Sequence, residues 1–262
     1  MEEEGCRAVW FTDHLFFPHD TPEPLTIAAV AAASTSRCFI GTGVLQAPLR
    51  PAALVAKAAA TVDALAPGRL ILGVGIGEQE QEFQLAGADF SARARSLDEA
   101  IDRWRALWQP GVGRFVQKPT PGRIPIWIGG RSSAALDRVV RQGDGWMPMF
   151  VSTARFARGI DELDSRLSDL ERPAESVVRS VLVLVSVDSE RWSATDARNH
   201  ADSIFDAPPE ALERHVVTGS AGQVAEKLAG YRDAGANHVA VLPMHPDPAD
   251  VFASISAEMP HT

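Results

Sequence analysis

The chain has 262 residues, of which 45% are hydrophobic and 23% charged, as in an ordinary globular protein. Its formal net charge of -9 argues against nucleic-acid binding, which needs a basic face, but leaves room for an anionic cofactor held by a local cluster of cations. No apolar run approaches the roughly 20 residues of a membrane span, and the N-terminus is acidic where a signal peptide would be basic. The cysteines Cys6 and Cys38 suit a reducing cytosol. We therefore expect a soluble cytoplasmic protein with no nucleic-acid or membrane partner.

Short apolar runs alternate with longer helical patterns along the chain. The apolar runs predict seven strands, over residues 8–12, 38–44, 69–74, 124–128, 145–148, 179–187 and 238–242. Helical spacing with start and stop signals predicts helices over 51–65, 96–108, 133–142 and 220–234. Ser96, with Glu99 three residues later, has the pattern of a capping box. This strand–helix–strand repeat predicts a parallel sheet with right-handed crossovers.

Two architectures fit this repeat: a doubly wound open sheet and a (β/α)8 barrel. Glycines lie at the ends of several different strands, which favours the mouth of a barrel, and the run 73–77 lacks GxGxxG spacing. We therefore predict an α/β protein with a TIM-type (β/α)8 barrel, in one domain over residues 1–262. Only seven strands are counted, and residues 2–5 resemble the last turn of a helix. The first strand and most of the first helix are therefore expected to precede Met1.

The run 124–133 is apolar up to Gly129 and Gly130, and Arg131 with two serines then opens a helical pattern. A strand that is apolar at every position is buried on both faces, and a Gly-Gly break lets the backbone approach a ligand. Arg131 at a helix N-terminus is a candidate phosphate ligand. The alternative is an ordinary strand–turn–helix with a surface arginine and a serine cap.

Two groups at strand ends are candidates for proton transfer. Asp13 and His14 follow the first predicted strand, and an imidazole titrates near neutral pH. Glu78 follows three closely spaced glycines on a loop that can approach a ligand. The alternatives are that Asp13 caps a loop while His14 packs, and that Glu78 belongs to a solvated acidic run. No metal-ligand spacing, P-loop or GxSxG motif is found, so a metal site is not expected.

Five motifs in this order resemble the bacterial luciferase-like superfamily, and within it the F420-dependent oxidoreductases. They are Val9-Trp10-Phe11-Thr12-Asp13-His14, Ile40-Gly41-Thr42-Gly43-Val44, the run from Gly68 to Gly77, the run from Ile124 to Gly130, and Gly143-Asp144-Gly145-Trp146. The resemblance extends from Val9 to the C-terminus. It implies a TIM-type barrel with the deazaflavin across the carboxyl ends of the strands.

The resemblance also implies roles for matching residues. His14, with Glu78 as a second candidate, would move the proton that accompanies hydride transfer between coenzyme F420 and a small organic substrate. Gly43–Val44 matches a place where such proteins often have a non-prolyl cis peptide bond. The implied cofactor-binding residues are Asp13, Thr42, Gly43, Val44, Gly75, Gly77, Gly129, Gly130 and Arg131.

Two alternatives stay open. One keeps the fold but uses FMN, as a two-component monooxygenase. The other is a cofactor- or partner-binding protein without turnover, which the missing strand favours. Relatives often carry a hairpin between the positions of Trp108 and Ile124, where this chain is short. They commonly dimerise, so a homodimer is expected.

Overall fold

The computed structural model describes residues 2, 5–17, 19–111, 116–205 and 208–258. The chain forms two compact units, each taken by itself below. The N-terminal unit comprises Arg7–Gly130 and Asp137–Gly145, and the C-terminal unit comprises Met1–Cys6, Arg131–Leu136 and Trp146–Thr262. Helix α5 (Ser133–Gln142) and strand β6 (Gly145–Met147) contain residues of both units.

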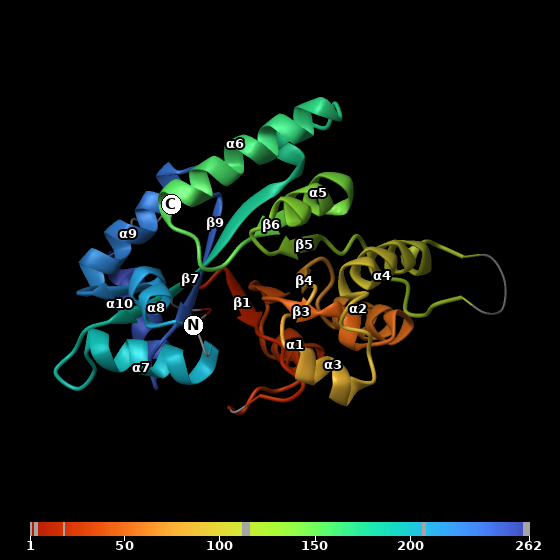
Figure 1. Cartoon of the computed structure of the whole chain (residues 1–262). Coiled ribbons are helices and arrows are strands. Elements are labelled where there is room, and N and C mark those ends of the chain that lie inside the picture. Colours follow the sequence, from red (N-terminus) through yellow and green to blue (C-terminus); the bar gives the residue numbers. More distant parts are fainter. Residues whose placement is uncertain (1, 3–4, 18, 112–115, 206–207, 259–262) are drawn as a thin grey trace. The chain divides into compact units, whose positions relative to one another are not determined.

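Parallel strands form the sheet of the N-terminal unit (Figure 1). They are β1 (Ala8–Phe11), β2 (Phe39–Thr42), β3 (Leu45–Gln46), β4 (Leu70–Gly75) and β5 (Ile126–Gly129). Their order is β1-β2-β4-β5, and β3 also pairs with β4. Because all these pairings are parallel, the carboxyl ends of the strands meet at one edge of the sheet.

Helices of the N-terminal unit alternate with these strands. They are α1 (Pro24–Ser34), the short 3-10 helix η1 (Ala47–Leu49), α2 (Ala52–Leu65), α3 (Glu80–Ala86) and α4 (Arg93–Trp108). Trp104 and Trp108 of α4 are buried and donate their indole N–H groups to the carbonyls of Ala52 and Ala56 in α2. These bonds satisfy the polar atoms of two large core side chains, so both indole N–H groups have a partner where α4 packs on α2.

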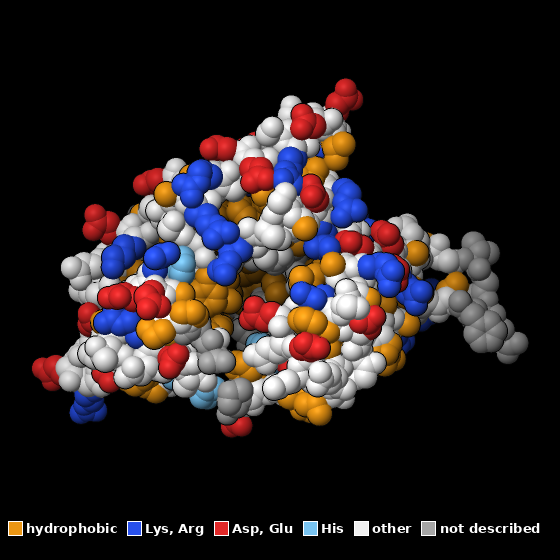
Figure 2. Space-filling view, viewed as in Figure 1, with side chains coloured by type: hydrophobic (Ala, Val, Ile, Leu, Met, Phe, Trp, Pro, Cys, Tyr) orange, Lys and Arg blue, Asp and Glu red, His pale blue; other side chains and the backbone are white. Residues whose placement is uncertain are grey.

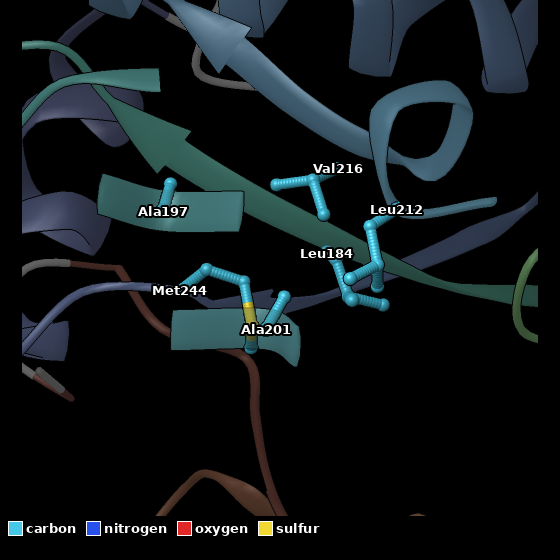
Figure 3. Packing of buried hydrophobic residues seen from close by; sticks show 6 residues of the cluster. All are labelled: Leu184, Ala197, Ala201, Leu212, Val216 and Met244. Carbon is cyan, nitrogen blue, oxygen red and sulfur yellow. The ribbon is translucent and has the colours of Figure 1, made fainter. Parts of the chain in front are cut away.

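In the C-terminal unit, β7 (Val178–Val187) pairs in parallel with both β8 (Val216–Gly219) and β9 (His238–Pro243). The helices are α6 (Thr153–Asp169), the 3-10 helix η2 (Ala174–Ser176), α7 (Ala194–Phe205), α8 (Pro209–His215), α9 (Ala221–Asp233) and α10 (Pro248–Glu258). Figure 3 shows one buried cluster of this unit, formed by Leu184, Ala197, Ala201, Leu212, Val216 and Met244. Ala197 and Ala201 are four residues apart and so share the face of α7 that meets the sheet.

Every predicted strand range contains a strand, but the count of seven was too low. The structure adds β3 and β8, which have only two and four residues. The two residues of β3 are below the window in which alternation can be recognised, and β8 begins at Val216 directly after α8, with no turn signal between them. The helices predicted over 51–65, 133–142 and 220–234 are confirmed to within about one residue at each end.

Two smaller expectations have different outcomes. The capping box at Ser96 was wrong, because α4 begins at Arg93 and places Ser96 inside the helix. The helical turn expected over residues 2–5 includes two residues outside the described part of the chain. None of the helices in the described ranges combines the length and apolar character needed to cross a bilayer.

Candidate functional site

The carboxyl ends of the strands bring polar side chains together in the N-terminal unit. Asp13 and His14 follow β1, and Gln46 ends β3 beside Gly75 at the end of β4. Arg50 follows η1, the 3-10 helix that comes directly after β3. The pairing of Phe11 with Thr42 places the ends of β1 and β2 side by side. The local sequence thus sends each strand into a polar turn, and parallel pairing collects those turns at one edge.

Asp13 ties two of these turns together. Its side chain is buried, with 3% exposure, and Arg50 binds it in bidentate fashion, Nη1 to Oδ2 at 2.6 Å and Nη2 to Oδ1 at 2.7 Å. The backbone N–H of Gln46 also donates to Oδ2, at 2.7 Å. A bidentate guanidinium pair is among the stronger charge-assisted contacts. Both carboxylate oxygens therefore serve to hold the loop after β1 against the turn after β3.

His14 lies against a second buried carboxylate. Its Nδ1 is 2.9 Å from Oε2 of Glu82 in α3, and the exposed fractions of the two side chains are 19% and 1%. The imidazole also stacks on Phe17, with ring centroids 4.0 Å apart and an interplanar angle of 14°. The ring is therefore held at its Nδ1 edge and on one face, while part of it stays accessible.

Glu82 accepts hydrogen bonds from several donors. The backbone N–H groups of Leu15 and Phe16 donate to Oε1 at 2.6 and 3.2 Å, and Nε2 of Gln46 donates to Oε2 at 3.1 Å. Burial favours the neutral acid, but hydrogen bonds from His14, Gln46 and Phe16 outweigh it and hold the pKa of Glu82 below its ordinary value. Glu82 is therefore ionised at neutral pH.

Val44 fills a space between glycines at the strand ends. The Gly43–Val44 peptide bond is cis, as the resemblance implied. A Cβ added at Gly75 would lie 2.8 Å from Val44 Cγ2, and one added at Gly129 would lie 3.1 Å from Val44 Cγ1. The hydroxyl of Thr42 is buried and donates to the carbonyl of Gly73 at 2.6 Å. The absence of side chains at these positions thus lets the backbone close around Val44.

The remaining predicted residues lie at or beyond these strand ends. Gly77 has a φ of 76°, and a Cβ there would meet the Gln46 side chain at 2.7 Å, so only glycine suits this turn. Gly130, after β5, has a φ of 101°. Glu78 is exposed, whereas Glu82, one helical turn further along, faces the interior. The structure thus pairs His14 with Glu82 and leaves Glu78 in solvent.

Arg131 lies in the C-terminal unit, among other cations. It lines a pocket together with Arg155 and Arg158 of α6, and the other lining residues are Leu136, Trp146, Val151, Gly159 and Glu162. Figure 2 shows Lys and Arg side chains gathered on the surface around α6. Nη1 of Arg131 donates to the carbonyl of Phe150 at 3.0 Å. This position is chemically suited to an anion.

The pKa of His215 is affected by the same group of arginines. Burial lowers its pKa below the ordinary value, and the charges of Arg131, Arg214 and Arg155 lower it further. Each of these groups favours a neutral imidazole. An anion bound at Arg131 would offset that repulsion.

Three contributors to the His14 site were missed from the sequence: Gln46, Arg50 and Glu82. Glu82 is 68 residues from His14 along the chain, so no local pattern joins them. One usable signal was the position of Glu82 next to the buried Phe83 in a short helix. Across the described residues, no three His, Cys, Asp or Glu side chains converge as metal ligands would.

Solved structures with the same fold cover nearly the whole chain. An F420-dependent secondary alcohol dehydrogenase in complex with an F420-acetone adduct matches with a TM-score of 0.84 and 18% identity, over 98% of this chain and 91% of that one. The coenzyme F420-dependent tetrahydromethanopterin reductase of Methanopyrus kandleri matches with a TM-score of 0.77 and 17% identity, over 98% and 91%. The fold class is thus the TIM-type (β/α)8 barrel, with its candidate groups at the carboxyl ends of strands.

Sequence comparison assigns the family. The model of the luciferase-like monooxygenase family matches residues 1–204, and the chain belongs to that family. An F420-dependent glucose-6-phosphate dehydrogenase of Nocardia farcinica is 28% identical over 288 residues, covering 91% of this chain and 84% of that protein.

Proposed function

We propose that the protein is an oxidoreductase that uses coenzyme F420 to transfer a hydride to or from a small organic substrate. The observation that carries the proposal is the accessible imidazole of His14, held by buried Glu82 where the strands end. The names of the Nocardia farcinica relative and of two structural neighbours, which are F420-dependent oxidoreductases, support the choice of cofactor. The substrate is not identified by these likenesses.

The strand-end residues fit a flat heteroaromatic ring. Glycines at the ends of β4 and β5 surround the apolar side chain of Val44, so no bulky group rises from these positions. Oε1 of Gln46 is buried and has no hydrogen-bond partner among the described residues, so a ring N–H that reached it would satisfy an unused acceptor. When bound, F420 supplies a ring carbon that gives or accepts a hydride.

The proposal gives the protein's own residues three tasks. Thr42, Gly43, Val44, Gly75 and Gly77 shape the surface for the ring, and Asp13 contributes by fixing the loop that carries His14. His14 moves the proton that accompanies the hydride, since an imidazole does so readily near neutral pH. Glu78 is the second candidate for this proton transfer.

Other residues are proposed to bind the anionic part of the cofactor. Gly129 and Gly130 allow close approach of the backbone after β5, and Arg131 offers a guanidinium for phosphate. The single domain, the homodimer and the cytoplasmic location stay predictions.

The test is reduction of F420 by the purified protein with a panel of small alcohols and glucose 6-phosphate. Replacing His14 by Ala should lower kcat by about 100-fold or more while leaving F420 affinity largely intact. The matched control is His19→Ala, which removes an exposed imidazole five residues away. Equal turnover in wild type and His14→Ala contradicts the assigned role. Turnover dependent on reduced FMN and oxygen, with none on F420, favours the monooxygenase alternative.

A further inference from the structure

We propose that Glu82 is a positioning residue that fixes the tautomer of His14. Glu82 accepts a hydrogen bond from Nδ1–H and leaves Nε2 as the only ring nitrogen that exchanges a proton with substrate. This inference rests on the proposed function for the role of Nε2, but the tautomer itself is a property of the protein alone.

The first step concerns which atom carries the hydrogen between His14 and Glu82. The carboxylate of Glu82 is 1% exposed and already accepts from Leu15, Phe16 and Gln46. An ionised carboxylate has no proton to give, so a hydrogen bond of 2.9 Å to Nδ1 requires that Nδ1 be the donor. A neutral His14 therefore has its free lone pair on Nε2.

The contacts of Gln46 are compatible with the same assignment. Its Nε2 lies 2.7 Å from the carbonyl oxygen of Asp13 and 3.1 Å from Oε2 of Glu82, so both amide hydrogens are in use. The 3.2 Å approach of Gln46 Nε2 to Nδ1 of His14 is then a contact between two donors. Turning the amide over would place Oε1 against two acceptors, so the observed orientation is the favourable one.

Phe17 and the loop restrict the imidazole further. Stacking at 4.0 Å fixes the plane of the ring, and the backbone of Leu15 and Phe16 is bonded to the same carboxylate that holds Nδ1. One buried group in α3 thus sets both the loop after β1 and the direction of its imidazole. An orienting hydrogen bond on the far nitrogen of a histidine commonly selects the tautomer in this way.

Of the charged groups around His14, Glu82 has the strongest electrostatic effect on the imidazole. Asp13 is adjacent in sequence, but Arg50 neutralises it through two bonds and also lies 3.5 Å from Glu23. Glu82 comes from α3 and has no guanidinium partner among its described contacts. It therefore stabilises the imidazolium that forms when Nε2 takes up a proton.

The test is nitrogen NMR of the histidine side chains in the cofactor-free protein, with His14 assigned by its absence in His14→Ala. Wild type should show Nδ1 protonated and Nε2 free at high pH. In Glu82→Gln the amide presents a donor to Nδ1, so the tautomer should invert, with the hydrogen on Nε2 and the free lone pair on Nδ1. Glu80→Gln, an exposed neighbour on α3, should leave the tautomer unchanged.

If the neutral imidazole of His14 in wild type carries its hydrogen on Nε2, the proposal is overturned, even if no Glu82 variant folds. An unchanged tautomer in folded Glu82→Gln overturns it as well. Glu82→Asp, which keeps the acceptor, should restore the wild-type tautomer; the inverted form in that variant also counts against the proposal. If the tautomer is as expected but F420 does not bind, the proposed function fails while the positioning by Glu82 stands.

Discussion

His238 gives the clearest prediction about pH and stability. The ring belongs to β9, opposite Ser180 of β7, and burial lowers its pKa to about 4. In the unfolded chain a histidine titrates near 6.5, so the unfolded state takes up a proton first as the pH falls. Stability is therefore insensitive to His238 above about pH 7, declines between about pH 6.5 and pH 4, and levels off below.

The magnitude follows from the two pKa values. Linkage between a pKa of about 4 in the folded state and about 6.5 in the unfolded state gives a loss of about 2 kcal/mol between pH 7 and pH 5. Because the imidazole is only partly shielded, this is an upper figure. It is still a substantial share of a stability of about 5–15 kcal/mol.

The assay is urea unfolding of wild type and His238→Gln at pH 7 and pH 5. His215, whose pKa is also lowered by burial, contributes in the same direction, so the difference between the two proteins isolates His238. Wild type should lose about 2 kcal/mol more than the variant over this interval. Equal losses in both proteins would refute the reasoning.

Three further changes probe packing and polar contacts. Gly159→Ala places a Cβ 2.3 Å from the ring of buried Trp146, so thermal unfolding should show a loss of about 1–3 kcal/mol. Gly230→Ala, where the nearest neighbour is 3.5 Å away, should instead gain up to about 1 kcal/mol from helix propensity. Arg69→Ala removes bonds to the carbonyl of Ala32 in the last turn of α1 and to that of Cys38 just before β2, and should cost about 2 kcal/mol in urea unfolding. If Arg69→Ala has the stability of wild type, or if the two glycine variants change stability equally, these accounts are contradicted.

Local signals gave most of the fold. The apolar runs located the principal strands except β8, and the end of β1 identified Asp13 and His14, because a strand and the turn after it are encoded by adjacent residues. The cis bond at Gly43–Val44 was reached only through a family resemblance. Nothing in the composition of that dipeptide requires it.

The choice of carboxylate shows where sequence reasoning ends. Glu78, Glu80 and Glu82 form one acidic run, and only the helical phase of α3 turns the last of them inward. That phase depends on where α3 begins and on which face packs against the loop after β1. Both are decided by tertiary contacts between segments 68 residues apart.

The most direct test of the central claim is a binding titration of the purified protein with F420 and with FMN, followed by cofactor fluorescence. The account predicts saturable binding of F420 in the micromolar range and weaker or no binding of FMN. His14→Ala should bind F420 with nearly the wild-type Kd. Saturable binding of FMN alone would contradict the account.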